Sequence, residues 1–229
     1  YIEFDELIDC VIVAHEYDKK QDYPSEQSSA IRFEPGMREK DLQSYEILNE
    51  LKEAIDLGQI CTYVQPQFDI LKHEYVSMEA LVRWNHPTKG ILTPDMFINI
   101  CEEHGYISKI DFCVLEQMCA YIKKRIDQNL RVLPVAINQS QKTIHEEGYI
   151  ERLISTVEKY SVPPRYIELE VTESAYVNKL DETIAILTQL REYGFRISMD
   201  DFGTGYSSLN FLKDIPVDEI KIDRAFLSA

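Results

Sequence analysis

Short apolar runs alternate with longer amphipathic stretches through most of this chain, and this alternation limits the fold more than any other feature. The amphipathic stretches repeat apolar residues at helical spacing, as between Ile110 and Ile126. Strands that alternate with helices of this length are typical of a parallel sheet, open or closed into a barrel. Pro66 and Pro134 fall inside two of the runs, so those strands are expected to be interrupted or to start late. The strand candidates are residues 61–70, 76–84, 131–140, 166–174, 196–202 and 219–226.

Polar side chains stand at or near the ends of these runs, and their placement favours a barrel. Asn138, Glu170, Asp200 and Lys221 each lie within or directly after an apolar run. A barrel collects its chemistry at the carboxyl ends of many strands. An open doubly wound sheet usually carries a glycine-rich phosphate loop after its first strand, and this sequence has none there.

Adjacent carboxylates at a strand end indicate a cation site. Asp200 and Asp201 would repel each other unless a cation lay between them. Together with Glu79, Asn138 and Glu170 they form the oxygen-rich set that two hard cations require. The five histidines form no ligand pair, which favours magnesium, manganese or calcium over zinc. The alternative for each residue taken alone is a strand-end side chain that caps the next helix.

Two basic residues accompany this acidic set. Lys221 lies on a strand whose alternate positions are apolar, so its ammonium is expected to point into the acidic mouth and orient or deprotonate a water. Arg83 follows Glu79 by four positions and shares its face of the strand, where a guanidinium could grip a phosphate. The alternatives are a surface lysine with a buried stem and an ion pair between Arg83 and Glu79.

The segment from Asp201 to Gly203 also spells a protein-kinase metal motif, but its surroundings exclude that interpretation. The chain has no HRD loop, no VAIK lysine and no glycine-rich nucleotide flap. Gly203 and Gly205 are better explained as part of a loop beside the cation site, where glycines allow positive φ.

Composition narrows the classes of partner and compartment. The 229 residues carry a net charge of −16, which disfavours binding to nucleic acid polymers and to anionic membranes. The sequence has neither an apolar run long enough for a membrane span nor a signal-peptide pattern. Its five cysteines form no CxxC pair, so we expect free thiols in a reducing cytosol.

Several motifs in sequence order resemble the EAL-domain family of bacterial cyclic di-GMP phosphodiesterases. The resemblance begins with Gln65-Pro66 and continues from Glu79 to Trp84 as EALVRW. The later matches are Asn138-Gln139-Ser140, Glu170-Val171-Thr172-Glu173, Asp200 to Gly205 and Lys221-Ile222-Asp223. The resemblance implies an EAL domain over residues 39–229. Residues 1–38 resemble the closing helix and strand of a GGDEF-like domain, followed by a linker.

The family resemblance implies a fold, a reaction and a role for each matching residue. The fold would be α/β, a modified TIM (β/α)8-type barrel with an antiparallel first strand. The reaction would be hydrolysis of cyclic di-GMP to linear pGpG with two Mg2+ or Mn2+ ions, in a cytoplasmic homodimer that upstream segments can anchor to the inner membrane. The implied metal ligands are Glu79, Asn138, Glu170, Asp200 and Asp201. The implied catalytic residues are Lys221, which would activate the attacking water, and Glu173, which would hold the loop 202–207. The implied dinucleotide contacts are Gln65, Leu81 and Arg83.

One departure from the family pattern affects the expected activity. The pattern continues with two further strands and another metal-ligand glutamate, whereas this sequence ends at Ala229 after the sixth strand candidate. Six strands do not close a barrel of this type, so we expect a truncated barrel with impaired catalysis. The alternative function is an EAL-like domain that binds cyclic di-GMP or docks a partner protein without hydrolysis.

Overall fold

The structure is a computed structural model that describes residues 35–176, 179–203, 213 and 215–223. It divides the chain into two compact units, residues 1–53 and 54–229. The first helix of the described residues is α2 (Pro35–Asp56). Most of the predicted tail over residues 1–38 lies outside the described residues, and the predicted boundary after residue 38 falls inside α2. That division therefore stays a prediction.

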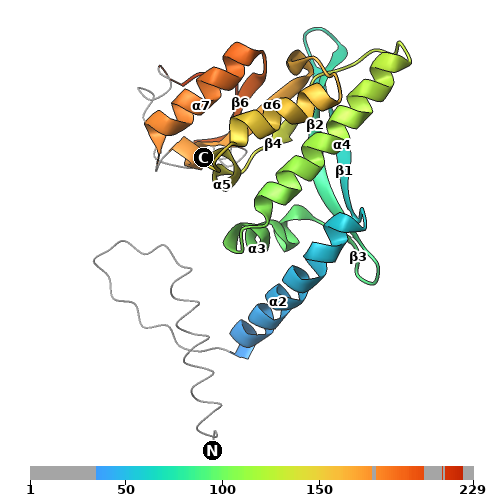
Figure 1. The fold of residues 1–229 in the computed structure, drawn as a ribbon, viewed down its shortest axis with the longest axis vertical. Helices are drawn as coiled ribbons and strands as arrows, with labels where there is room; N and C mark the ends of the chain where they lie inside the picture. The colour runs from blue at the N-terminus through green and yellow to red at the C-terminus, as the bar shows by residue number, and fades with distance from the viewer. Residues whose placement is uncertain (1–34, 177–178, 204–212, 214, 224–229) are drawn as a thin grey trace, which may run out of the picture. The chain divides into compact units, whose positions relative to one another are not determined.

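The second unit is built on one mixed sheet (Figure 1). Its described strands run in the spatial order β1-β2-β4-β5-β6-β7, and β3 pairs with β2 off this path. The β1–β2 pair is antiparallel, while the steps from β2 to β4, β5, β6 and β7 are all parallel. The strands are β1 (Ile60–Asp69), β2 (Glu74–His86), β3 (Gly90–Leu92), β4 (Val135–Asn138), β5 (Ile167–Thr172), β6 (Arg196–Phe202) and β7 (Glu219–Ile222).

All six predicted strands are present, and the two prolines act differently. Pro134 lies just before β4, which starts late as predicted, and its carbonyl accepts a hydrogen bond from the Met78 amide at 2.9 Å. Pro66 lies inside β1 without interrupting it. Among the described strands β1 pairs only with β2, and an edge strand tolerates a residue that has no N–H. The short strand β3 was not predicted, because three residues give too little periodicity.

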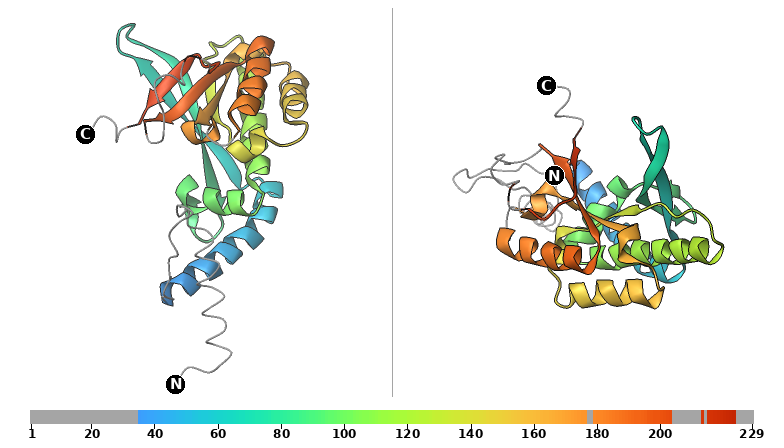
Figure 2. Two further views of the ribbon diagram at one scale, coloured as in Figure 1. Left: turned by 90° about the vertical axis from the view of Figure 1, so that its left-hand side faces the viewer. Right: turned by 90° about the horizontal axis from the view of Figure 1, so that it is seen from above.

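Helices connect the parallel strands. They are η1 (Pro94–Met96), α3 (Ile98–Glu103), α4 (Ile107–Asp127), α5 (Gln141–Ile144), α6 (Tyr149–Lys159), η2 (Pro164–Tyr166), η3 (Glu173–Tyr176) and α7 (Leu180–Tyr193). Figure 2 shows α4, α6 and α7 on one face of the sheet. None of the described helices has the length and apolar character that crossing a bilayer requires.

Alternation along the strands separates an apolar layer from a polar one. In β5, Ile167, Leu169 and Val171 belong to the hydrophobic core that the helices cover. Glu168 and Glu170 point to the opposite face and are nevertheless 3% and 1% exposed. Burying a carboxylate costs free energy unless the carboxylate has a charged partner. The buried glutamates of this face therefore require charged partners.

The described cysteines are free thiols, as the sequence predicts. Cys61, Cys101, Cys113 and Cys119 form no disulfide, and Cys101 and Cys119 are buried. Burial raises the pKa of both buried thiols to about 12, which keeps them protonated and unreactive at neutral pH. The remaining cysteine, Cys10, lies outside the described residues.

Candidate active site

Strand register brings the predicted polar residues together on the face opposite the helices. Asn138 pairs with Glu170 across β4 and β5, and Thr172 pairs with Asp200 across β5 and β6. In parallel strands, paired residues project to the same face, so these side chains lie next to one another near the carboxyl ends. Glu79 pairs with Ala136, two positions before Asn138, and thus shares this face at a slightly deeper level. We call this set the acidic face.

Glu170 is the most buried member of the acidic face. One of its carboxylate oxygens, Oε1, accepts a hydrogen bond from the ammonium of Lys221. The other oxygen, Oε2, is buried and has no hydrogen-bond partner. Burial raises the pKa of Glu170 to about 7, although the bond and charge of Lys221 act in the opposite direction.

Lys221 connects two carboxylates of the acidic face. Its Nζ also lies 3.8 Å from Glu79 Oε2, so the ammonium sits between Glu79 and Glu170. Burial acts to lower the pKa of Lys221, but the hydrogen bond to Glu170 and the charges of Glu170, Glu79 and Asp200 outweigh it and raise the pKa. The ammonium is therefore charged at neutral pH and points into the acidic face, as the strand pattern predicted.

The end of β6 has an irregular backbone at the predicted cation ligands. The register with β7 shifts between Met199 and Phe202, and Asp201 has a φ of 56°. A left-handed conformation is uncommon for a residue with a side chain, and aspartate is among the residues that tolerate it best. Burial, and then the negative charges of Asp200 and Asp223, raise the pKa of Asp201. Two carboxylates thus crowd the strand end, as the sequence indicated.

The oxygen atoms of the acidic face suit a divalent cation. Within the described part of the chain, no three His, Cys, Asp or Glu side chains already stand close enough together to hold a metal ion. A buried carboxylate oxygen without a partner is nevertheless costly, and Glu170 Oε2 is such an oxygen. A hard cation is the partner that this oxygen and the neighbouring Asn138 and Asp200 oxygens suit best. The residues therefore fit a magnesium-like ion.

Glu173 has the contact that its predicted role requires. It is 4% exposed, and its Oε2 accepts a hydrogen bond from the Gly203 amide at 2.9 Å. Gly203 has a φ of 100°, a conformation that favours glycine. Glu173 thus fixes the first part of the segment after β6, while residues 204–207 of the predicted loop lie outside the described residues.

The predicted dinucleotide contacts lie on the same face of the β1–β2 hairpin as Glu79. In that antiparallel ladder Gln65 pairs with Glu79, Tyr63 pairs with Leu81, and Cys61 pairs with Arg83. The Arg83 guanidinium lies 5.9 Å from the centre of the Tyr63 ring, and its Nη1 donates to the Val82 carbonyl at 2.7 Å. Glu79 forms its ion pair with Lys221, so the alternative in which Arg83 only neutralises Glu79 receives no support.

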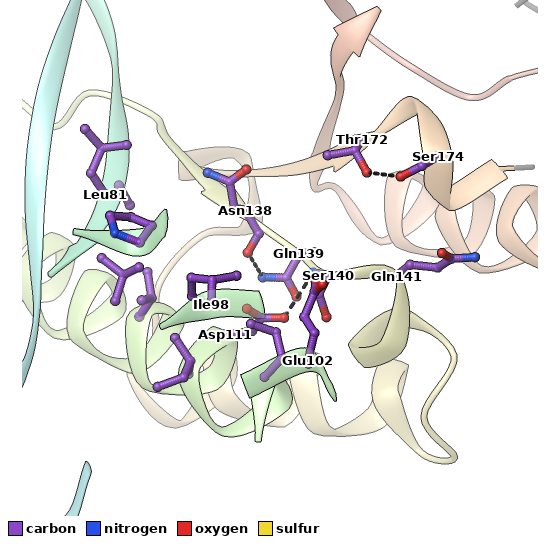
Figure 3. A pocket seen from close by; sticks show the side chains of 16 residues that line it. Leu81, Ile98, Glu102, Asp111, Asn138, Gln139, Ser140, Gln141, Thr172 and Ser174 are labelled. Atoms are coloured by element: carbon purple, nitrogen blue, oxygen red, sulfur yellow. Dashed lines mark hydrogen bonds between the residues drawn. The ribbon is translucent and has the colours of Figure 1, made fainter. Parts of the chain in front are cut away.

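A cavity of about 400 Å3 opens beside the acidic face. Figure 3 shows Asn138 between Leu81 and Thr172 along its wall. Its lining also includes Asp111 on α4, which accepts hydrogen bonds from the Ser140 amide at 3.0 Å and the Thr143 hydroxyl at 2.6 Å. Sequence reasoning missed Asp111, although a lone carboxylate between Ile110 and Phe112 in an apolar helical stripe was a usable signal.

Comparison with known proteins identifies the family. Residues 48–229 match the family model described as "EAL domain". The chain belongs to the EAL-domain family. This assignment confirms the resemblance drawn from the sequence motifs, and the mixed sheet with its antiparallel first strand confirms the predicted α/β fold class.

Curated relatives of this EAL domain include two proteins of Pseudomonas aeruginosa. "Cyclic di-GMP phosphodiesterase NbdA" is 37% identical over 185 residues, which cover 81% of this chain and 24% of the relative. "Bifunctional diguanylate cyclase/cyclic di-GMP phosphodiesterase MucR" is 34% identical over 196 residues, which cover 86% of this chain and 29% of the relative. The chain thus spans less than a third of the length of these relatives.

Solved structures of EAL domains have the same fold. "PaMucR Phosphodiesterase, c-di-GMP complex" has a TM-score of 0.75 at 35% identity and covers 80% of this chain and 74% of that chain. The Xanthomonas citri FimX EAL domain in complex with c-diGMP has a TM-score of 0.73 at 18% identity and covers 83% of this chain and 74% of that chain. The second likeness supports the fold alone.

Proposed function

We propose that the protein containing this EAL domain is a metal-dependent phosphodiesterase that hydrolyses cyclic di-GMP to linear pGpG. Family membership and the name of the relative NbdA support this substrate and reaction. The observation that carries the proposal is the buried Glu170 carboxylate, which contacts Lys221 through one oxygen and leaves the other without a partner. Such an arrangement suits a carboxylate that shares its charge between an ammonium and a cation.

Mg2+ or Mn2+ is the proposed cofactor, with two ions in the complete site. Bound there, the ions would lower the pKa of a water and offset negative charge that develops on the phosphodiester oxygens. The residues proposed to hold them are Glu79, Asn138, Glu170, Asp200 and Asp201.

Lys221 would act on the attacking water from within the acidic face. Its Nζ carries three hydrogens, and Glu170 and Glu79 hold the ammonium in one position. An ammonium fixed in this way can orient a water by donating to its oxygen. Glu173 would keep the backbone after Asp201 in place through the Gly203 amide. Both residues are therefore proposed to contribute position as well as charge.

The hairpin would supply the contacts to the dinucleotide. Arg83 carries a guanidinium whose planar donors match a phosphate, and the Tyr63 ring lies against it. Gln65 and Leu81 lie on the same face and could contact the remainder of the ligand. Positive groups at Arg83 and Lys221, together with the cations, would let a protein of net charge −16 bind an anion.

We further infer a cytoplasmic location and a homodimer formed through the EAL domain. The cytoplasmic inference is supported by the free thiols among the described cysteines, and the dimer inference by family membership alone.

The deciding experiment measures hydrolysis of cyclic di-GMP by the intact gene product, with pGpG followed by chromatography in Mg2+, in Mn2+ and in EDTA. We expect metal-dependent product that disappears in Asp200→Asn and Glu79→Ala while folding is retained. The 229-residue chain is assayed in parallel for comparison. If the folded intact protein binds cyclic di-GMP and releases no product, the enzyme proposal is wrong and the receptor function takes its place.

A further inference from the structure

His145 links two elements that stand behind the acidic face. It follows α5 and is half-buried, and both of its ring nitrogens have partners. Nδ1 lies 2.8 Å from the carbonyl oxygen of Gln141, and Nε2 lies 3.0 Å from the hydroxyl oxygen of Thr183 on α7. The ring therefore bridges the segment that follows β4 and the first turns of α7.

Thr183 extends this link to the helical turn that carries Glu173. Its hydroxyl donates to the carbonyl oxygen of Ala175 in η3 at 3.1 Å. Thr183 and Ala175 are both 0% exposed, so water cannot readily replace either partner. Two residues earlier in the same turn, Glu173 holds the Gly203 amide. A continuous path of contacts thus runs from α5 to Gly203.

Which atoms of this path donate a hydrogen depends on whether the His145 ring is neutral or doubly protonated. The Gln141 carbonyl can only accept, so Nδ1 must carry a hydrogen. The Ala175 carbonyl can also only accept, and the Thr183 hydroxyl has one hydrogen to donate. With the ring doubly protonated, Nε2 donates to Thr183 and Thr183 donates to Ala175. With the ring neutral, the single hydroxyl hydrogen must be divided between Nε2 and Ala175.

We propose that His145 and Thr183 are positioning residues that hold η3, and through Glu173 the backbone at Gly203. The expected effect of this link on turnover rests on the proposed phosphodiesterase function. The expected effect on the backbone at Gly203 does not. Neither residue contacts the acidic face, so their effect is transmitted through Glu173.

The link itself is made of groups that carry no formal charge apart from the ring. The charged residues close to the link in the sequence are Lys142, Glu146 and Glu147 around His145, Lys179, Asp181 and Glu182 at the start of α7, and Glu173 in η3. Three of them have other partners: Lys142 donates to the Glu102 carbonyl, Glu146 lies 3.9 Å from Arg152, and Lys179 lies 3.1 Å from Glu182.

The test compares amide hydrogen exchange in the intact gene product for the wild type, Thr183→Val and Thr183→Ser. Valine keeps the shape of threonine without the hydroxyl, and serine keeps the hydroxyl. We expect Thr183→Val to lower the protection factors of η3 and Gly203 by roughly three- to tenfold, as the loss of one hydrogen bond would. Thr183→Ser should stay close to the wild type. Equal protection in the valine and serine variants would overturn the proposal.

His145→Phe tests the ring and also covers the case in which Thr183→Val does not fold. Protection at Gly203 should be lower in His145→Phe than in the wild type at one fixed pH, because phenylalanine keeps a ring and removes both nitrogens. The loss in the phenylalanine variant should be similar to the loss in Thr183→Val. Wild-type protection at Gly203 in this variant would contradict the role of the ring.

Turnover of cyclic di-GMP by the same proteins separates this inference from the proposed function. Loss of the link should lower kcat by a larger factor than it raises KM, because the dinucleotide contacts on the hairpin are untouched. A wild type without turnover would tell against the phosphodiesterase function alone, since the exchange measurements would still decide the link.

Discussion

The ammonium of Lys221 on β7 hydrogen-bonds one oxygen of the buried Glu170 carboxylate on β5 and leaves the other oxygen without a partner. The two residues come from strands that are separated by β6, so the contact spans the polar face of the sheet. A pair of this kind is costly to bury and costly to break, because removing one member leaves the other without compensation.

Replacing Lys221 by methionine keeps the apolar stem and removes the ammonium. We expect turnover of cyclic di-GMP to fall about 100-fold or more, the usual contribution of a positioned group that acts on a reacting proton. Without the ammonium, the pKa of Glu170, which burial already raises to about 7, should rise further. Steady-state rates in Mg2+ measure the effect, with Lys221→Arg as the control that keeps the charge. Wild-type turnover in a folded methionine variant would remove Lys221 from the mechanism.

Arg83 is expected to act on substrate binding. Arg83→Met should raise KM roughly 10- to 100-fold, because charge-assisted hydrogen bonds to a phosphate contribute about 1.5–3 kcal/mol each. The matched control is Tyr63→Phe, which keeps the ring that lies 5.9 Å from the guanidinium. Binding of cyclic di-GMP measured by calorimetry should weaken in the methionine variant and stay unchanged in the control. Equal affinities would mean that Arg83 does not contact the ligand.

Strand pattern allowed much of this site to be predicted. In β5 the alternation of Ile167, Leu169 and Val171 with glutamates is enough by itself to mark an apolar face and a polar face. The placement of polar residues at strand ends likewise predicts where chemistry collects, and strand register does bring Asn138 beside Glu170.

Contacts between distant strands could not be predicted in the same way. The meeting of Lys221 with Glu170 depends on the register of β5, β6 and β7, including the shift between Met199 and Phe202. Asp111 was not predicted as a site residue, for a different reason. Helical periodicity treats a carboxylate in an apolar stripe as an interruption, whereas its partners Ser140 and Thr143 lie on another segment and appear only in the fold.

Asp111 should make stability depend on pH. Burial raises the pKa of this carboxyl from 3.8 to about 6, although hydrogen bonds from Thr143 and Ser140 act against the rise. Between these two values the folded protein binds more protons than the unfolded chain, so stability should fall as the pH rises from about 4 to about 6. The full effect has an upper limit of about 3 kcal/mol.

Asp111→Asn isolates this contribution. Both hydrogen bonds reach the same carboxylate oxygen, Oδ2, so an amide oxygen can take its place and accept from Ser140 and Thr143. Urea unfolding at several values between pH 4 and pH 7 should show that the asparagine variant gains stability relative to the wild type as the pH rises. A constant difference between the two proteins over this range would show that Asp111 does not titrate there.

Gln117 should stabilise the attachment of β1 to α4. Its Oε1 accepts from the Thr62 hydroxyl at 2.9 Å, and its Nε2 donates to the Ile60 carbonyl at 2.8 Å. Gln117→Leu leaves both partners on β1 unsatisfied, and we expect a loss of about 1–3 kcal/mol in the free energy of unfolding. Thr62→Val removes one of the two bonds and should cost less. Because the two residues share a hydrogen bond, the double variant should lose less stability than the sum of the single variants. Strictly additive losses in urea unfolding would mean that the bond between Thr62 and Gln117 contributes nothing.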